Sequence, residues 1–302
     1  MSKEFYITSD QADRRIDRLL RNMWPQVPLG TLMKAIRTGE VRLDAKKVRQ
    51  DTRVEEGQFL QVPWNDDMPA ERNTKENTSS IRHERLETIY KDDYLWIINK
   101  PAGLLTQPDI KNGDSLITRV LEELKWTRTD FRPSTVQRLD RNTSGAVIVA
   151  LTGPSLRYLS ELIRERKIKK IYRAVVAGDI IESGNIDFPL LKDQDGNTVK
   201  VDESGQSALT RYRKISSFKK ISTVEAELVT GRPHQARVHF AAIGHPIIGD
   251  RKYGGDTGWA KRPLLHAYSV TLPDDIGLPE AIRGKEFKAS LPGDMEEYFN
   301  EM

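Results

Sequence analysis

A polar tract divides the chain into two parts. Residues 64–85 read WNDDMPAERNTKENTSSIRHER and contain almost no aliphatic side chains. A segment of this composition cannot bury enough apolar surface to offset the entropy lost on ordering, so it is typical of a flexible linker. The length of 302 residues is enough for two domains. The sequence therefore predicts a small domain over residues 1–63 and a larger one over residues 86–302.

The composition is that of a globular protein with a polar surface. Charged residues make up 30% of the chain and hydrophobic residues 37%. No stretch approaches eighteen uninterrupted apolar residues, and the first ten residues lack the apolar centre of a secretion signal, so no membrane association is expected. Cysteine is absent, which excludes disulfides and thiolate metal sites. A reducing compartment, the cytoplasm, is the expectation.

The first domain is predicted to hold two helices and a short hairpin. Ile16, Leu19, Leu20 and Met23 recur at helical spacing, and LGTLMKAIRTGEVRL continues as a second helix with Gly39 as its stop. The segments EVRL and GQFLQVP alternate like strands. Basic side chains crowd this region, either as a solvated helix face or as a surface that follows RNA phosphates. They are Arg14, Arg15, Arg18, Arg21, Lys34, Arg37, Arg42, Lys46, Lys47 and Arg49.

The second domain is dominated by strand patterns. Strands are predicted at LETIY, YLWIINK, AVIVAL, IYRAVVAGDI, SALTRYRKI, STVEAELVT and LLHAYSVTLP. Helices are predicted at SLITRVLEELK and PSLRYLSELIRERKIKK. Because strands outnumber helices and do not alternate regularly with them, we expect an α+β fold. Its central sheet should be mixed, largely antiparallel, and flanked by helices and loops.

The segment QRLDRNTSG contains the most ambiguous residue, Asp140. Asp, Asn, Thr, Ser and Gly all form turns, and on residue types alone a turn ahead of the AVIVAL strand is the favoured interpretation. A functional interpretation requires an exposed carboxylate with a cationic partner. Arg138 and Arg141 flank Asp140, but neighbours in sequence often point apart.

Two further segments carry unusual chemistry. TGRPHQARVHFAAIGHPIIGDRKYGG holds His234, His239 and His245, whose spacing fits no common metal pattern, so no metal is expected. No phosphate-binding glycine motif is present. RERKIKKIYRAVVAG surrounds Tyr172 with basic residues, which suits single-stranded nucleic acid, although a solvated helix end is the alternative.

These stretches together resemble one family. NKPAGLLTQP, QRLDRNTSG, KIYRAVVAG, TGRPHQARVHFAAIGHPIIGDRKYG and RPLLHAYSVTLP occur in the order and spacing of the RluA-type RNA pseudouridine synthases. The resemblance covers roughly residues 11 to 295, and FPLLKDQDGNTVKVDESGQSALTRY is most similar to the RluC branch. Residues 11–63 resemble the small RNA-binding module, of the S-four type, that is shared with certain ribosomal proteins.

The resemblance implies a pseudouridine synthase fold and a reaction. A uridine in folded RNA is detached at its glycosidic bond, and the uracil rejoins the ribose through carbon 5 without a cofactor or metal. The target cannot be reached in a stacked helix, so the nucleotide must flip out. Ribosomal RNA of the large subunit is the expected substrate, in preference to transfer RNA, and a monomer is expected.

The resemblance also implies roles for individual residues. Asp140 aligns with the catalytic aspartate, a nucleophile or the base that starts cleavage, and Arg237 aligns with its arginine partner. Tyr172 aligns with the tyrosine that packs on the target base and helps to remove the carbon 5 proton. Arg138 aligns with the arginine that displaces the base or fills its vacancy. Leu265 aligns with an apolar residue of the pocket.

Some expectations concern RNA binding and the departures from the family. Arg164, Lys167 and Lys170 are predicted to hold the RNA. Gln137 stands where the family usually has histidine, and Ala236 replaces a larger aliphatic residue. One alternative is therefore an RNA-binding protein that has lost catalysis. A generic glycosidase is a weaker alternative, because it normally needs two carboxylates and the sequence nominates one.

Overall fold

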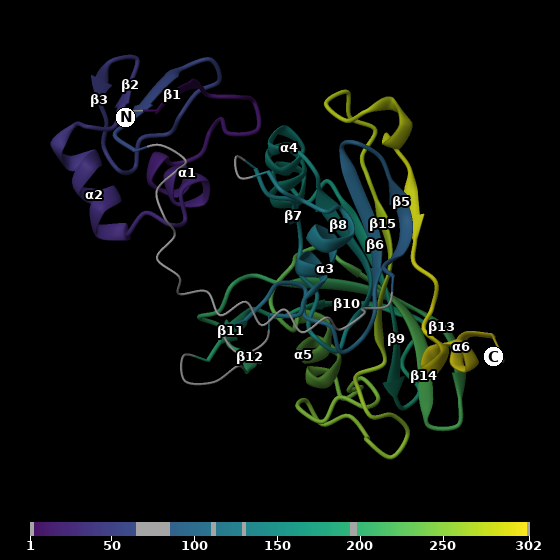
Figure 1. The fold of residues 1–302 in the computed structure, drawn as a ribbon. Helices are drawn as coiled ribbons and strands as arrows, with labels where there is room; N and C mark the ends of the chain where they lie inside the picture. Colours follow the sequence, from purple (N-terminus) through teal and green to yellow (C-terminus); the bar gives the residue numbers. More distant parts are fainter. Residues whose placement is uncertain (1–2, 65–84, 110–112, 129–130, 194–197, 301–302) are drawn as a thin grey trace.

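The structure is a computed structural model that describes residues 3–64, 85–109, 113–128, 131–193 and 198–300. The chain forms a small N-terminal module, residues 3–64, and a larger part built on one twisted sheet (Figure 1). Residues 65–84, which belong to the predicted linker, lie outside the described residues. None of the described helices is both long and apolar enough to cross a membrane.

The N-terminal module confirms the predicted helices and adds two strands, β1 (Lys3–Tyr6) and β3 (Lys46–Lys47). Its sheet has the order β1-β4-β2-β3. Strand β1 was not predicted because its four residues alternate between exposed and half-buried positions. Trp64, assigned to the linker from sequence, is buried against Trp24, with ring centroids 5.9 Å apart. The elements are β1 (Lys3–Tyr6), α1 (Ile16–Met23), α2 (Leu29–Thr38), β2 (Arg42–Leu43), β3 (Lys46–Lys47) and β4 (Phe59–Val62).

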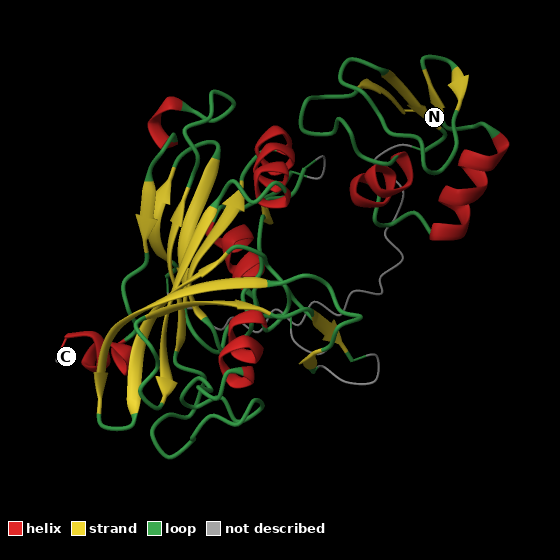
Figure 2. Cartoon of the chain, turned by 180° about the vertical axis from the view of Figure 1, so that it is seen from behind, coloured by secondary structure: helices red, strands yellow, loops and turns green. Residues whose placement is uncertain are grey.

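The larger part confirms the α+β prediction. The main path of its sheet runs β10-β13-β14-β9-β15-β8-β6-β5, with β16 beside β15 and β7 beside β8. Among the described strand pairs, β15 and β8 alone run parallel. Figure 2 shows the sheet as one strongly twisted layer.

The bounds of its elements are as follows. The first half contains β5 (Glu87–Lys91), β6 (Leu95–Lys100), α3 (Leu116–Glu123), β7 (Ser134–Thr135), β8 (Ser144–Ala150), α4 (Gly153–Arg164), β9 (Lys169–Ala177) and β10 (Ser183–Asp187). The second half contains β11 (Leu190–Lys192), β12 (Val199–Val201), β13 (Leu209–Phe218), β14 (Ile221–Leu228), α5 (Gln235–Ala242), β15 (Leu265–Thr271), η1 (Glu280–Ile282), β16 (Glu286–Lys288) and α6 (Gly293–Asn300).

The sheet has a core on each side, and β8 shows why. Successive side chains of a strand point to opposite faces. Val147 and Val149 therefore join a core that includes residues of α3 and α5. Ala146, Ile148 and Ala150 join a second core with residues of α4. Both faces of the central strand are buried, which explains its unbroken apolar sequence.

Two differences from the predicted elements have local causes. The helix predicted over residues 154–170 ends at Arg164, because Arg166 adopts the left-handed conformation with φ 60°. The N–H of Lys167 then donates to the carbonyl of Leu162 at 2.8 Å, which closes the helix end. Helix α5 was not predicted, since the density of Gly, Pro and His around it indicated turns.

The N-terminal module contacts the larger part through one loop. The Asp10 carboxylate accepts a hydrogen bond from the Gly153 N–H at 2.8 Å, at the start of α4. Arg157 donates to the carbonyls of Ser9 and Ala12, at 3.0 and 2.9 Å. A Cβ atom on Gly153 would lie 2.6 Å from the Asp10 Cα. Contact at this distance is available only to glycine.

Candidate active site

Asp140 lies in the loop between β7 and β8. The Thr106 hydroxyl accepts from the Leu139 N–H at 3.1 Å and donates to the Leu139 carbonyl at 2.8 Å. The Thr143 N–H donates to the Asp140 carbonyl at 3.1 Å. The Asn-Thr-Ser-Gly segment is therefore a real turn, and it fixes the carboxylate directly ahead of a buried strand. The turn and functional interpretations are compatible.

The NKPAGLL segment supports this loop. The fully buried Lys100 ammonium donates to the carbonyls of Pro101, Leu104 and Arg141, at 2.9, 2.8 and 3.2 Å. Gly103 adds a backbone N–H to the Arg141 carbonyl at 2.8 Å. Burial lowers the pKa of Lys100 to about 7, whereas three carbonyl acceptors match the three protons of an ammonium. Sequence reasoning treated this motif as a turn and missed the lysine.

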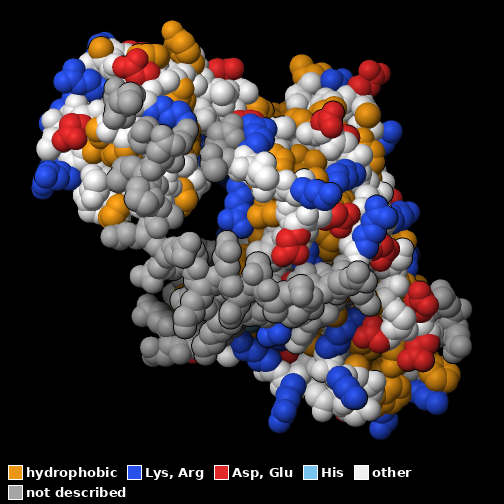
Figure 3. All heavy atoms as spheres, in the orientation of Figure 1, with side chains coloured by type: hydrophobic (Ala, Val, Ile, Leu, Met, Phe, Trp, Pro, Cys, Tyr) orange, Lys and Arg blue, Asp and Glu red, His pale blue; other side chains and the backbone are white. Residues whose placement is uncertain are grey.

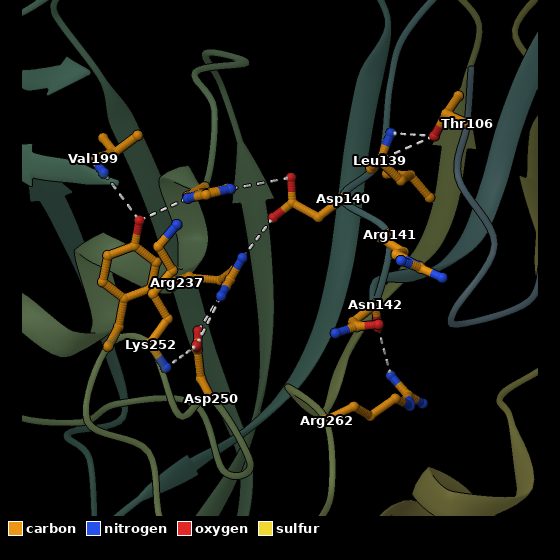
Figure 4. A network of polar contacts seen from close by, with 12 residues as sticks. Thr106, Leu139, Asp140, Arg141, Asn142, Val199, Arg237, Asp250, Lys252 and Arg262 are labelled. Carbon is orange, nitrogen blue, oxygen red and sulfur yellow. Dashed lines mark hydrogen bonds and ion pairs between the residues drawn. The ribbon is translucent and has the colours of Figure 1, made fainter. Parts of the chain in front are cut away.

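Arg237 connects Asp140 to a second carboxylate (Figure 4). Its Nη1 donates to Asp140 Oδ2 at 3.1 Å, while Nε and Nη2 donate to Asp250 at 2.7 and 2.8 Å. The Asp250 side chain is 1% exposed and that of Asp140 is 31% exposed. Asp250 thus fixes the guanidinium by a bidentate pair, and Asp140 is the member of the cluster that substrate can reach. Asp250 was missed in the sequence, although it follows the glycine turn of the Arg237 motif.

The Arg237 guanidinium is a permanent cation. Burial by itself would lower the pKa of Arg237. The hydrogen bonds and charge of Asp250, and then those of Asp140, raise this pKa above its ordinary value. The cluster therefore keeps one positive charge between two carboxylates.

His234 and Tyr253 form a second layer beside the cluster. His234 Nε2 lies 3.8 Å from Asp140 Oδ1, and its Nδ1 shares a hydrogen bond with the Tyr253 hydroxyl at 2.7 Å. That hydroxyl also accepts from the Val199 N–H at 3.1 Å. Burial lowers the pKa of His234, and at 3.8 Å a neutral imidazole packs against the carboxylate without a hydrogen bond. His234 precedes α5 in the left-handed conformation, with φ 54°, and so turns its ring to the site.

The other histidines of this motif serve separate parts of the fold. His239 bonds to the Thr210 hydroxyl and the Phe188 carbonyl, at 2.9 and 3.0 Å. His245 bonds to the Ala177 carbonyl at 2.7 Å. In the part of the chain that the structure describes, no three His, Asp or Glu side chains are grouped to hold a metal ion.

Tyr172 and Leu265 are both buried on the sheet. They lie on the neighbouring strands β9 and β15, and both belong to the core that includes residues of α3 and α5. Burial raises the pKa of Tyr172 well above its usual value, and the charge of Asp140 raises it further. Tyr172 is therefore a neutral phenol close enough to Asp140 to sense its charge.

Arg138 and Gln137 precede Leu139 in the same loop. Arg138 is exposed. The Gln137 amide donates to the Ala146 carbonyl of β8 at 3.5 Å, and its Oε1 is buried without a hydrogen-bond partner among the described residues. Gln137 therefore packs against the strand that follows the loop.

The basic residues that were predicted to hold RNA, Arg164, Lys167 and Lys170, lie on different sides of the sheet. Lys170 is buried on β9, two residues before Tyr172 and on the same side of the strand. Arg164 pairs with Glu161 and Lys167 with Glu165 near the end of α4, which packs on the other core. The structure brings Lys170 towards the site and leaves Arg164 and Lys167 outside it. Their role in RNA binding stays a prediction.

Comparison with known proteins identifies the class of enzyme. The family model described as RNA pseudouridylate synthase matches residues 94–242, which contain Asp140, Tyr172 and Arg237. The fold is similar to that of Human RNA Pseudouridylate Synthase Domain Containing 4, with a TM-score of 0.56 and 24% identity over 70% of this chain and 92% of that chain.

Two bacterial relatives extend the match beyond this region. The ribosomal large subunit pseudouridine synthase C of Vibrio cholerae is 33% identical over an alignment of 313 positions. This alignment covers 98% of this chain and 95% of that protein. The protein of the same name from Escherichia coli is 34% identical over 259 residues, or 82% and 78% of the two chains. The chain belongs to the RluA-type RNA pseudouridine synthases, which are isomerases.

Proposed function

We propose that this enzyme isomerises specific uridines of large-subunit ribosomal RNA, with Asp140 as the catalytic carboxylate. The observation that carries the proposal is the accessible Asp140 carboxylate, held 3.1 Å from the fixed Arg237 cation. The names of the bacterial relatives support ribosomal RNA as substrate. We propose that the enzyme acts as a monomer in the cytoplasm, where it meets this RNA.

The chemistry starts at the ribose. The Asp140 carboxylate either attacks C1′ or takes the proton from C2′, and the electrons of the glycosidic bond leave with the uracil at N1. The uracil turns and its C5 forms the new bond to C1′, while the Asp140–C1′ bond breaks in the first route or C2′ regains its proton from Asp140 in the second. The C5 proton is then lost and N1 gains one. Arg237 holds the carboxylate in place through both steps, so less orientational entropy is lost when substrate arrives.

Tyr172 contributes its ring first. The buried phenol, beside Leu265, offers a flat apolar face to a flipped uracil. Because burial keeps Tyr172 protonated, it can take the C5 proton only as its own phenolic proton departs. We therefore assign Tyr172 to base packing, with any proton transfer secondary.

The free energy of RNA binding must offset the cost of flipping the target base out of its stack. Flipping costs a few kcal/mol, and less from a loop or a distorted stem. Exposed Arg138 lies two residues from Asp140, where it can fill the vacated stack. The N-terminal module offers a cavity of about 520 Å³ lined by five arginines, which suits RNA phosphates. This cavity is lined by Asp13, Arg14, Arg15, Arg18, Arg21, Asn22 and Arg53.

The test is tritium release from ribosomal RNA labelled at uracil carbon 5. Wild-type protein should release tritium, and Asp140→Asn should reduce the rate at least ~10³-fold while leaving RNA binding within about twofold. Asp93→Asn, an exposed carboxylate of the β5–β6 turn, is the matched control and should retain full activity. Normal turnover by Asp140→Asn would show that the catalytic assignment is wrong.

The same assay separates the non-catalytic alternative. The sequence feature that supports a binding protein without catalysis is Gln137. In the structure, the Gln137 side chain contacts the β8 backbone. Glutamine cannot act as a base, so activity in the wild-type protein would show that histidine is dispensable there. RNA binding without any tritium release would favour the binding protein. Gln137→His should then be assayed for restored release.

A further inference from the structure

The segment between α5 and β15 forms a closed loop, residues 250–262. Its base is pinned, since the Leu264 N–H donates to the Ile248 carbonyl at 2.9 Å. A Cβ atom on Gly249 would lie 2.7 Å from the carbonyl carbon of Arg262, so the two ends of the loop meet at glycine. The loop also folds back on itself, since the Gly249 N–H donates to the Asp256 carbonyl at 2.7 Å.

Each end of this loop holds one part of the active site. At the first end, Asp250 orients Arg237. At the other end, Arg262 donates to the Asn142 carbonyl at 3.2 Å, two residues after Asp140 (Figure 4). Arg262 is itself held by a bidentate pair with Asp294 of α6, at 2.6 and 2.7 Å. The loop is thus part of the framework around the catalytic carboxylate.

The second half of the loop carries an exposed tryptophan. Trp259 is 48% exposed, and in the part of the chain that the structure describes no aromatic ring packs against it. The other four tryptophans of the chain are buried or half-buried. Two residues, Ala260 and Lys261, lie between Trp259 and Arg262, so the two Cα atoms are at most about 11 Å apart. Trp259 therefore belongs to the end of the loop whose Arg262 contacts the Asn142 carbonyl.

The surroundings of Trp259 are basic. Arg251, Lys252 and Lys261 are exposed on the same loop, against a single exposed carboxylate, Asp256. Figure 3 shows Lys and Arg side chains spread over the lower end of the molecule, where this loop lies. Aromatic rings among cations are the combination that holds unpaired nucleotides, through stacking on the base and contacts to the phosphates.

We propose that Trp259 is a stacking platform for an unpaired RNA base next to the flipped uridine, with the loop cations contacting the adjoining phosphates. This inference rests on the RNA substrate of the proposed function and adds a requirement to it: the target uridine must lie beside a nucleotide that is free to leave its stack. A fully paired helix around the target offers no such base. Trp259 thereby selects for loops and distorted stems.

Kinetics with ribosomal RNA provide the first test. Trp259→Ala should raise KM between about fivefold and about 100-fold, the effect of losing one stacked base, with kcat unchanged. Trp259→Phe should restore most of the loss, because a phenyl ring still stacks. Ile276→Ala is the control: Ile276 is 88% exposed and lies in the segment between β15 and η1, at the other end of the sheet in Figure 1. It should leave both constants unchanged.

Fluorescence provides a second test that needs no catalysis. A single-stranded oligouridylate should quench the wild-type tryptophan emission, and Trp259→Phe should lose this quenching. A blunt duplex of equal length should bind through phosphates without quenching. Equal quenching by wild-type and Trp259→Phe protein, or by strand and duplex, would overturn the stacking proposal. If wild-type protein shows the quenching but releases no tritium from any RNA, the proposed function fails and the stacking site stands.

Discussion

At the scale of single residues, the position of Asp140, the proposed catalytic carboxylate, depends on side chains that the sequence analysis did not single out. Asp250 orients the arginine, and Lys100 and Thr106 hold the loop backbone. Asp140 and Arg237 were predicted through their motifs. Asp250 was not, because a buried ion pair between residues 13 apart is decided by the turn that joins them.

The orienting role of Asp250 can be tested directly. Asp250→Asn removes one charge and one acceptor oxygen from Arg237, so the guanidinium should shift relative to Asp140. We expect kcat for tritium release to fall about 10- to 100-fold, the scale of a misplaced catalytic group, with RNA binding nearly unchanged. The exposed Asp256→Asn of the same loop is the control. Equal kcat for both variants would mean that Arg237 does not need Asp250.

The buried His266 leads to a prediction about how the free energy of unfolding depends on pH. It is buried on β15 and bonded to the Ser144 hydroxyl, and burial lowers the pKa of His266 to about 4 from 6.5. Between these values the unfolded chain binds a proton that the folded chain excludes. The free energy of unfolding should therefore fall as pH drops from about 6.5 to about 4, by at most about 1.4 kcal/mol per pH unit.

Urea unfolding at several pH values measures this effect. His266→Asn keeps a polar partner for Ser144 but does not titrate, so its stability should change less over the same window. Parallel pH profiles for the two proteins would rule out His266 as a source of acid sensitivity. The contact matters because Ser144 begins the strand that follows the loop of Asp140.

At the scale of elements, the parallel pairing of β8 and β15 depends on one glycine. Gly145 has φ 118°, and a Cβ atom there would lie 2.5 Å from the Ala267 nitrogen. Gly145→Ala should therefore lower the free energy of unfolding by more than about 3 kcal/mol or prevent folding. Gly30→Ala is the control on α2, where a methyl group meets nothing within 4 Å. It should be neutral or slightly stabilising in urea unfolding.

Elements whose own sequence carries a clear apolar pattern could be predicted from the sequence. Elements whose conformation depends on contacts with distant residues could not. The apolar run of β8 predicts a buried strand from sequence alone. Strands β10, β11, β12 and β16 are short and partly exposed, so their pairing is fixed by neighbours. Helix α5 begins after the left-handed residue His234 and contains one histidine, His239, whose partner Thr210 lies on another element. Its sequence therefore indicated turns.

At the scale of the whole molecule, the proposed function gives RNA two separate surfaces to contact. Arg18 and Arg21 line the arginine cavity of the N-terminal module. Replacing both with glutamine should weaken RNA binding and reduce the slope of log affinity against log salt by about 1.5, as expected for two lost phosphate contacts. Lys34→Gln with Arg37→Gln, on α2 and outside the cavity, is the matched pair. Equal slopes for both double variants would show that the cavity does not bind phosphates.

The division into two units and the fold class could be predicted from the sequence, whereas the contact between the two units could not. The polar tract indicated two units, and strand counts indicated the α+β class. The contact of Asp10 with α4 could not be predicted, because it joins residues 143 apart through a backbone N–H and carries no sequence signal.

That contact has a consequence for substrate choice. Gly153 leaves room for the Asp10 backbone, so the module and the larger part meet closely at this point. Under the proposed function, the distance between the module and Asp140 would then act as a ruler for the RNA. An RNA would qualify only if its anchored segment and its target uridine match that length. A single methyl group at residue 153 would wedge the two bodies apart. With the module and the larger part no longer in contact, the enzyme would accept RNAs of many shapes. Its selectivity for RNA would fall without any change at Asp140.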